Sequence, residues 1–308
     1  MSVSEVVFKV PSKRPAPQED LAPPAKRVKK EEQISSFFSA AIKAIAAQIE
    51  SFSSKSLNSK ELSVDSLINI KAFIYFRLGD LAAASDHVPY AENHYQTAYS
   101  LQPNLALRAR ILFSRYELHL ENQNPAKALK CLKKNSHVLS QDSLPEKSGS
   151  LPKEEFCKQL IENVTIIFNN FQMLGANNLD FFQLRIAMRE IRSFICLKCA
   201  EPLTTGQEKM EAYQMALAIR LLYSPRRFDA PKPDASIEEK IHHYEQILNP
   251  PINLKDIRAK NFCLLGDFYR VLKNKDLAVE HYEKAMKHVS SPDLRDVIAY
   301  GLERASAL

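Results

Sequence analysis

The chain has 308 residues, of which 45% are hydrophobic and only 6 are glycine, and its formal net charge is +6. This length and apolar content suffice to bury a sizeable core, in one elongated unit or in two compact ones. The glycines do not cluster, which excludes a glycine-rich phosphate-binding loop, and no apolar run reaches the roughly 18 residues of a membrane span. The 5 scattered cysteines argue against a disulfide framework and favour a reducing compartment on the cytosolic side.

The first 32 residues combine several prolines with few large apolar side chains, so we expect residues 1–32 to form a disordered tail. Two basic clusters lie in this tail, separated by the eleven positions 15–25. The arrangement resembles a bipartite nuclear localisation signal, whose basic side chains enter the acidic groove of a nuclear import receptor. The alternative is a tail that serves only solubility. The residues of the predicted signal are Lys13, Arg14, Lys26, Arg27, Lys29 and Lys30.

The section from 33 to 139 carries helical apolar spacing throughout. We expect a first helix from Gln33 to Ser54, followed by a hairpin whose first helix covers 64–79 and whose turn is the RLGD segment at 77–80. The second helix of that hairpin is predicted from Ala91, Tyr95 and Ala98, and residues 86–90 are an extra loop or an extra turn that ends at Pro89. Residues 104–138 predict a further, weaker hairpin with Pro125 at the first position of its second helix.

Residues 140–153 are rich in serine, proline and charge, and we expect a flexible insert there. The section 154–308 follows it. The helices predicted over 154–174, 179–199 and 207–223 have wide apolar faces without the hairpin pattern, and we interpret them as a degenerate central part of one helical stack. Ser236 and Glu239 form a capping box before a helix over 237–248, and residues 294–308 predict a capping helix.

The clearest pattern lies between 259 and 285, where two short helices flank a polar turn at 273–276. Apolar and small residues recur at spacings of three and four, so each set lines one face of its helix. A small residue in each helix marks a place where another helix approaches closely. The residues of the pattern are Phe262, Leu265, Gly266 and Tyr269 in the first helix, and Ala278, Tyr282 and Ala285 in the second.

This pattern resembles that of the tetratricopeptide repeat family. The resemblance is strong over this one hairpin, and the alternative is an ordinary helical hairpin. It implies an all-α fold, a TPR-like α-solenoid of stacked antiparallel helix pairs. It also implies a non-catalytic scaffold or adaptor that binds other protein subunits within a larger assembly.

The resemblance further implies a concave groove lined by the first helix of each hairpin. Three basic residues at such positions would suit a clamp for an acidic C-terminal peptide, as in a chaperone adaptor. The alternative is that these side chains are simply solvated. The predicted groove residues are Lys71, Arg108, Arg115, Arg258, Lys260 and Asp267, of which the first three would form the clamp.

No arrangement of residues predicts catalysis, a cofactor or a metal. Cys196 and Cys199 form a C-x-x-C pair, but the second pair that a structural zinc site needs is missing. His281 and His288 are interpreted as surface residues of a solvated helix face. We therefore expect a protein that is not an enzyme and does not enter a membrane.

Two functions remain open at this stage. The favoured one is a nuclear interaction scaffold, imported through the basic tail. The rival is a subunit that contacts DNA or RNA through the tail and the helical hairpins. The balance of seven cations against five acids in residues 1–32 weighs against strong phosphate binding by the tail.

Overall fold

The computed structural model describes residues 24–55, 61–140, 149–173, 181–201, 206–221, 231–232, 234–248 and 253–308. Within these ranges the chain is all-α apart from two three-residue strands, β1 (Glu61–Ser63) and β2 (Ser150–Pro152). The helices are α1 (Pro24–Lys55), α2 (Val64–Ala84), α3 (Val88–Ser100), α4 (Leu105–Glu121), α5 (Pro125–Leu139), α6 (Lys153–Met173), α7 (Phe181–Ala200), α8 (Gly206–Leu221), α9 (Ile237–Leu248), α10 (Leu254–Val271), α11 (Lys275–His288) and α12 (Pro292–Ser306).

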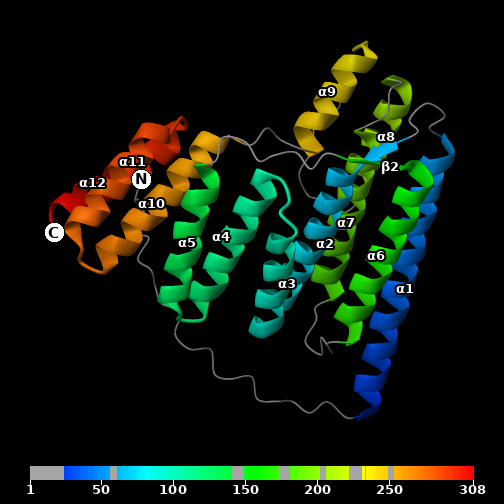
Figure 1. The fold of residues 1–308 in the computed structure, drawn as a ribbon, viewed down its shortest axis with the longest axis horizontal. Helices are drawn as coiled ribbons and strands as arrows, with labels where there is room; N and C mark the ends of the chain where they lie inside the picture. Colours follow the sequence, from blue (N-terminus) through cyan, green and yellow to red (C-terminus); the bar gives the residue numbers. More distant parts are fainter. Residues whose placement is uncertain are drawn as a thin grey trace.

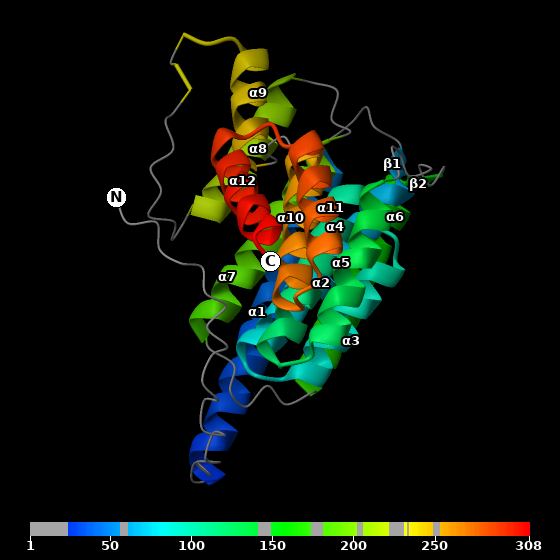
Figure 2. The ribbon, with the colours of Figure 1, turned by 90° about the vertical axis from the view of Figure 1, so that its left-hand side faces the viewer.

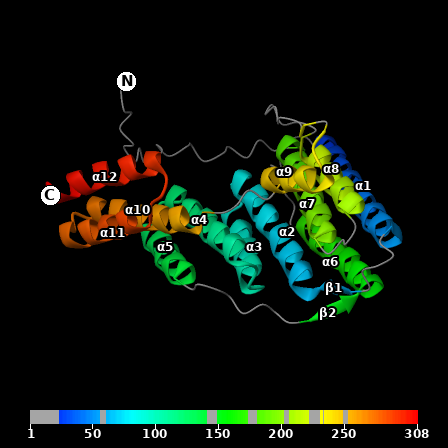
Figure 3. The same cartoon turned by 90° about the horizontal axis from the view of Figure 1, so that it is seen from above.

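The helices form an elongated, α-solenoid-like array (Figure 1). Three helical hairpins, α2/α3, α4/α5 and α10/α11, follow one another along it, and α12 packs on the last of them (Figure 3). Helices α6 and α7 pack on α2 at the other end and are covered in turn by α1, and α8 and α9 continue from α7. The apolar face of each helix is therefore buried against a neighbour in the array.

The order of helices in space differs from their order in the sequence. Helix α5 packs directly on α10, and Asn261 of α10 donates hydrogen bonds to the Leu132 carbonyl at 3.2 Å and to Ser136 Oγ at 2.6 Å. Helices α6 and α7 instead return to α1 and α2, where the rings of Phe73 and Phe194 stack at 4.2 Å. The interpretation of residues 154–223 as a central part of the stack is therefore wrong. Periodicity identified their apolar faces but not the helices that cover them.

A two-stranded antiparallel pairing anchors this return. Leu62 of β1 lies opposite Leu151 of β2, and the backbone N–H of Val64 donates to the Gly149 carbonyl at 3.1 Å. The pairing places the start of α6 beside the start of α2. Residues 149–153 thus belong to the folded array, although a flexible insert was expected over 140–153; positions 141–148 of that insert lie outside the described residues.

The α2/α3 hairpin closes around a glycine. Gly79 lies inside α2, and a Cβ atom there would be 2.6 Å from the ring of Tyr95 on α3, so only glycine admits that ring. The Tyr95 hydroxyl donates to Asp80 Oδ1 at 2.7 Å. The prediction of a turn at 77–80 is therefore wrong, because one glycine does not break a helix that gains this contact. The turn lies at 85–87, and Pro89 stands in the first turn of α3 instead of ending a helix.

The α10/α11 hairpin contains the same unit of glycine, aspartate and tyrosine, and in both hairpins the tyrosine follows the aspartate by 15 positions. Gly266 faces the ring of Tyr282, and the Tyr282 hydroxyl donates to Asp267 Oδ1 at 2.7 Å. A second glycine, Gly301 of α12, meets the ring toward its hydroxyl end, where a Cβ atom would lie 2.5 Å from Tyr282 Cε1. Tyr282 is fully buried as a result and joins three helices.

The α4/α5 hairpin lacks the pair of a glycine on the first helix and a tyrosine on the second. When Ala128 is aligned with Ala278, Tyr116 stands at the position of Gly266 and Leu132 stands at that of Tyr282. The large side chain has moved to the first helix and the smaller one to the second. Asn135 occupies the place of Ala285 and is fully buried, and neither its side-chain oxygen nor its nitrogen has a partner among the described residues.

Helix α1 begins earlier than the sequence suggests. The expectation that residues 24–32 are disordered is wrong, because α1 starts at Pro24. Proline suits the first turn of a helix, and the following alanine, lysine, arginine and glutamate residues are good helix formers. This first part of α1 projects past the ends of its neighbours (Figures 1 and 2). Lys26, Arg27, Lys29 and Lys30 lie in it, whereas Lys13 and Arg14 lie outside the described residues.

Candidate partner-binding surface

The six residues predicted to line a groove do not form one group. Arg108 of α4 donates to the Tyr99 hydroxyl of α3 at 3.3 Å. Arg115 of α4 forms an ion pair with Glu92 of α3 and donates to Gln96 Oε1 at 2.8 Å. Both arginines thus bridge two hairpins, and the predicted clamp with Lys71 would have to compete with these contacts.

The three predicted residues on α10 also face different neighbours. Asp267 accepts hydrogen bonds from Tyr282 of its own hairpin and from Arg270 at 3.3 Å. Lys260 is exposed, and its ammonium group lies 5.7 Å from the centre of the Phe113 ring of α4. Arg258 lines a pocket between α5, α10 and α11.

A repeated cation–aromatic contact marks the junctions between hairpins. Arg110 of α4 lies 5.0 Å from the ring centre of Phe76 on α2, and Lys260 of α10 lies in the same way over Phe113 of α4. The two cations occupy corresponding positions of their hairpins, as do the two rings, and both cations are exposed. Sequence reasoning missed Arg110. Alignment of the hairpins on Ala128 and Ala278 would have found it.

The pocket lined by Arg258 measures about 200 Å³. Asn261 is 1% exposed at its wall, and its side-chain oxygen has no partner among the described residues. The ring of Phe262 stacks on His288 at 5.7 Å and on His281 at 6.1 Å. The remaining lining residues are Ser136, Leu139 and Ser140.

The interpretation of His281 as a surface residue of a solvated helix face is therefore wrong. Its ring also stacks on Tyr269 at 5.3 Å with an interplanar angle of 3°. Burial lowers the pKa of His281, and the nearby ammonium group of Lys284 acts in the same direction. The histidine thus serves as a neutral aromatic ring between α10 and α11.

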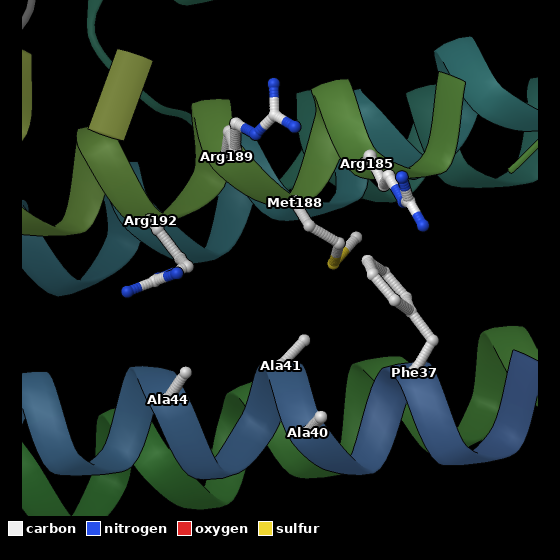
Figure 4. Close-up of a pocket in the computed structure, with 8 residues that line it drawn as sticks. All are labelled: Phe37, Ala40, Ala41, Ala44, Arg185, Met188, Arg189 and Arg192. Atoms are coloured by element: carbon white, nitrogen blue, oxygen red, sulfur yellow. The ribbon is translucent and has the colours of Figure 1, made fainter. Parts of the chain in front are cut away.

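A second hollow, of about 360 Å³, lies between α1 and α7. Figure 4 shows its two walls: Ala40, Ala41 and Ala44 of α1 turn toward α7, and Met188 lies beside the Phe37 ring. We call this hollow the α1–α7 groove. Three arginines of α7 complete its lining, namely Arg185, Arg189 and Arg192.

The arginines point in two directions. Arg185 and Arg192 extend toward α1 on either side of Met188, whereas Arg189 points away from α1 (Figure 4). The Arg192 guanidinium makes a long hydrogen bond of 3.5 Å to Gln48 Oε1 of α1. Gln48 is 8% exposed, and its amide nitrogen has no partner among the described residues. The guanidinium groups of Arg185 and Arg192 therefore present hydrogen-bond donors on the α1 side of α7.

Cys196 and Cys199, the C-x-x-C pair, are poor candidates for chemistry. Burial raises the pKa of Cys196 to about 12, and burial also raises the pKa of Cys199. A thiol must lose its proton to act as a nucleophile or a metal ligand. Where the structure places residues, no three His, Cys, Asp or Glu side chains come together in a way that would hold a metal ion.

Among the helices that the structure describes, none has both the length and the apolar character needed to cross a membrane. No family model matches the chain, and neither a curated protein nor a solved structure is significantly similar to it.

Proposed function

We propose that this chain is a non-catalytic scaffold of the tetratricopeptide type, which binds partner proteins through the first helices of its hairpins as a subunit of a larger nuclear assembly. The observation that carries the proposal is the repeated pair of exposed cations, Arg110 and Lys260, at corresponding positions on α4 and α10. Each lies over an aromatic ring of the preceding hairpin, which holds its charge in place on the surface. Ordered arginine and lysine side chains beside apolar rings suit a protein partner with acidic residues.

The resemblance of residues 259–285 to the tetratricopeptide pattern supports the same proposal. Two hairpins share the glycine, tyrosine and aspartate unit, which fixes the angle between their helices. A rigid row of hairpins presents its helix faces without a large ordering cost when a partner binds.

Site-specific photo-crosslinking in cells tests the proposal. A photoreactive amino acid replaces Arg110 or Lys260 in the full chain, and the matched controls carry it at exposed positions of second helices, Lys130 of α5 or Glu283 of α11. We expect protein cross-links from positions 110 and 260 that are absent from 130 and 283. Cross-links to RNA or DNA at the first-helix positions would instead establish the rival nucleic-acid function, and cross-links to neither would contradict both.

The nuclear part of the proposal needs its own test. Replacement of Lys26, Arg27, Lys29 and Lys30 by alanine should shift a fluorescently tagged chain toward the cytoplasm, because these residues form the larger basic cluster of the predicted signal. A control removes the same number of charges from exposed helix positions, namely Lys127, Lys130, Lys255 and Lys287. An unchanged nuclear signal in the first variant would remove residues 26–30 from the argument.

A further inference from the structure

The α1–α7 groove has defined ends. At one end the rings of Phe37 and Phe181 meet edge to face at 6.2 Å. At the other end Arg192 reaches Gln48 across the gap. Between these contacts α1 contributes three alanines, whose small side chains leave the space open. The groove is therefore an elongated space between two helices that touch at both of its ends.

The charges of the groove indicate what it would accept. Among the described residues, no carboxylate forms an ion pair with Arg185 or Arg192, which both line the groove. Arg185 and Arg192 are seven residues apart on α7, which is a separation of about 10.5 Å along a helix. Two carboxylates at the same spacing on a partner helix would face both guanidinium groups, and such pairs form strong charge-assisted hydrogen bonds.

The apolar lining of the groove favours one class of acidic ligand over the others. Five of its eight lining residues are apolar, and the alanines admit the close approach of a third helix. A phosphate or a nucleic acid strand would meet the arginines but would not cover the apolar surface that Ala40, Ala41 and Ala44 leave between the helices. We propose that the α1–α7 groove binds an acidic amphipathic helix of a partner protein. This inference rests on the proposed scaffold function and assigns it a second contact site, away from Arg110 and Lys260.

Binding of synthetic helices to the full chain tests the inference. The probe is a fluorescently labelled amphipathic helix with glutamates seven residues apart and with alanine and leucine on the adjoining face. Two matched helices carry glutamine or lysine in place of the glutamates. By fluorescence anisotropy, we expect the glutamate helix to bind about tenfold or more tightly than the glutamine helix. Equal binding of the two, or no binding of the glutamate helix, would overturn the inference.

A charge exchange locates the site. The double variant Arg185→Glu and Arg192→Glu should bind the glutamate helix at least about tenfold more weakly and should gain affinity for the lysine helix. The control Lys158→Glu removes an exposed cation of α6 and should leave both affinities unchanged. An unchanged affinity of the double variant would show that the helix binds elsewhere.

A neutral variant tests the apolar floor. Ala44→Phe fills the groove without changing charge, and we expect about a tenfold loss for the glutamate helix, with circular dichroism confirming that the fold is kept. A single-stranded oligonucleotide that displaces the helix, and whose own binding is lost in the double arginine variant but kept in Ala44→Phe, would overturn the inference in favour of a phosphate ligand. Because positions 110 and 260 are unaltered throughout, failure here is distinguishable from failure of the scaffold function.

Discussion

The hydroxyl of Tyr282 donates to the carboxylate of Asp267 at 2.7 Å, and Tyr95 holds the same relationship to Asp80 in a hairpin 187 positions earlier in the chain (282 minus 95). In both cases the ring lies on a glycine of the first helix and the hydroxyl reaches the residue after that glycine. The pair therefore fixes both the distance and the rotation between the two helices.

Removal of the hydroxyl isolates this bond. Tyr282→Phe keeps the ring on Gly266 and Gly301 but leaves Asp267 with one donor fewer, so we expect a loss of about 1 kcal/mol in the free energy of unfolding. Urea denaturation measures it. Tyr300→Phe, at a half-exposed tyrosine of α12, should change the stability far less and serves as the control. Equal effects of the two changes would contradict a structural role for the bond.

Replacement of Gly266 by alanine should lower the stability of the fold, although alanine has the higher helix propensity. Gly266→Ala would place a methyl group 2.9 Å from the rigid Tyr282 ring. Overpacking of this kind costs about 1–3 kcal/mol, which exceeds the gain of about 1 kcal/mol that alanine brings to a helix interior. We expect net destabilisation in thermal denaturation. In Gly206→Ala the nearest atom is the flexible Cγ2 of Ile237 at 3.1 Å, so a smaller effect is expected there.

Replacement of Asn135 should raise the stability of the fold. Its amide is buried without a partner among the described residues, at the position where the other two hairpins have Ala98 and Ala285. Asn135→Ala removes the desolvation cost of that amide, so we expect stabilisation by about 1 kcal/mol. Ala285→Asn is the reciprocal variant and should destabilise the fold. A loss of stability in Asn135→Ala would mean that the amide has a partner such as a bound water.

Arg115 should control the protonation of His119. The Glu92 carboxylate forms an ion pair with Arg115, and it lies 3.3 Å from His119 Nε2. Burial lowers the pKa of His119, the Glu92 charge raises it and the Arg115 charge lowers it. Arg115→Ala removes a lowering charge and frees Glu92 for the imidazole, so the pKa of His119 should rise. Titration of the His119 ring by NMR measures the shift, and a fall or no change would contradict this account.

Stability should decrease as the pH falls from about 7 to about 5. Burial lowers the pKa of His94 and of His281 below the usual 6.5, so the folded state favours the neutral rings. A histidine with a lowered pKa in the folded state does not reduce the free energy of unfolding above pH 6.5. Below that pH the unfolded chain binds a proton that the folded chain binds less readily, so the free energy of unfolding decreases. His281→Phe keeps the stack on Phe262 and Tyr269 without a titrating group. Its free energy of unfolding should therefore depend less on pH than that of the wild type.

Two buried carboxyl groups, Asp80 and Glu117, act in the other sense, and both are present in His281→Phe as in the wild type. Burial raises the pKa of Asp80 and of Glu117, so their protonated forms suit the folded state and add stability only as the pH approaches their own titration range. A pH slope that is identical in His281→Phe and in the wild type would remove His281 as a source of the effect.

The local elements of the fold were largely predictable from the sequence. The capping box of Ser236 and Glu239 is present, with hydrogen bonds of 2.8 and 3.1 Å, and Pro125 begins α5 as expected. These predictions succeed because caps and helix starts depend on neighbouring residues alone. The turn assigned to the RLGD segment at 77–80 was wrong, because Gly79 lies inside α2 and admits the ring of Tyr95.

The long-range arrangement was not predictable in the same way. An apolar stripe shows that a face is buried but not which helix buries it, so the packing of α5 on α10 and of α7 on α2 had no local signature. The α1–α7 groove was missed for the same reason, because Ala41 and Arg192 belong to distant segments. The predicted residues Arg115 and Asp267 were found on first helices, as expected, but their contacts with Glu92 and Tyr282 could not be read from spacing.

The seam between α5 and α10 has a consequence for the order in which the chain folds. Asn261 joins Leu132 across 129 positions of sequence, so the apolar side of α5 stays uncovered while the ribosome makes the whole segment between them. Helices α6 and α7 can meanwhile dock on α1 and α2, which have already emerged. The hairpin row is thus completed only near the end of synthesis, and until then the nascent chain leaves the apolar side of α5 that faces α10 exposed.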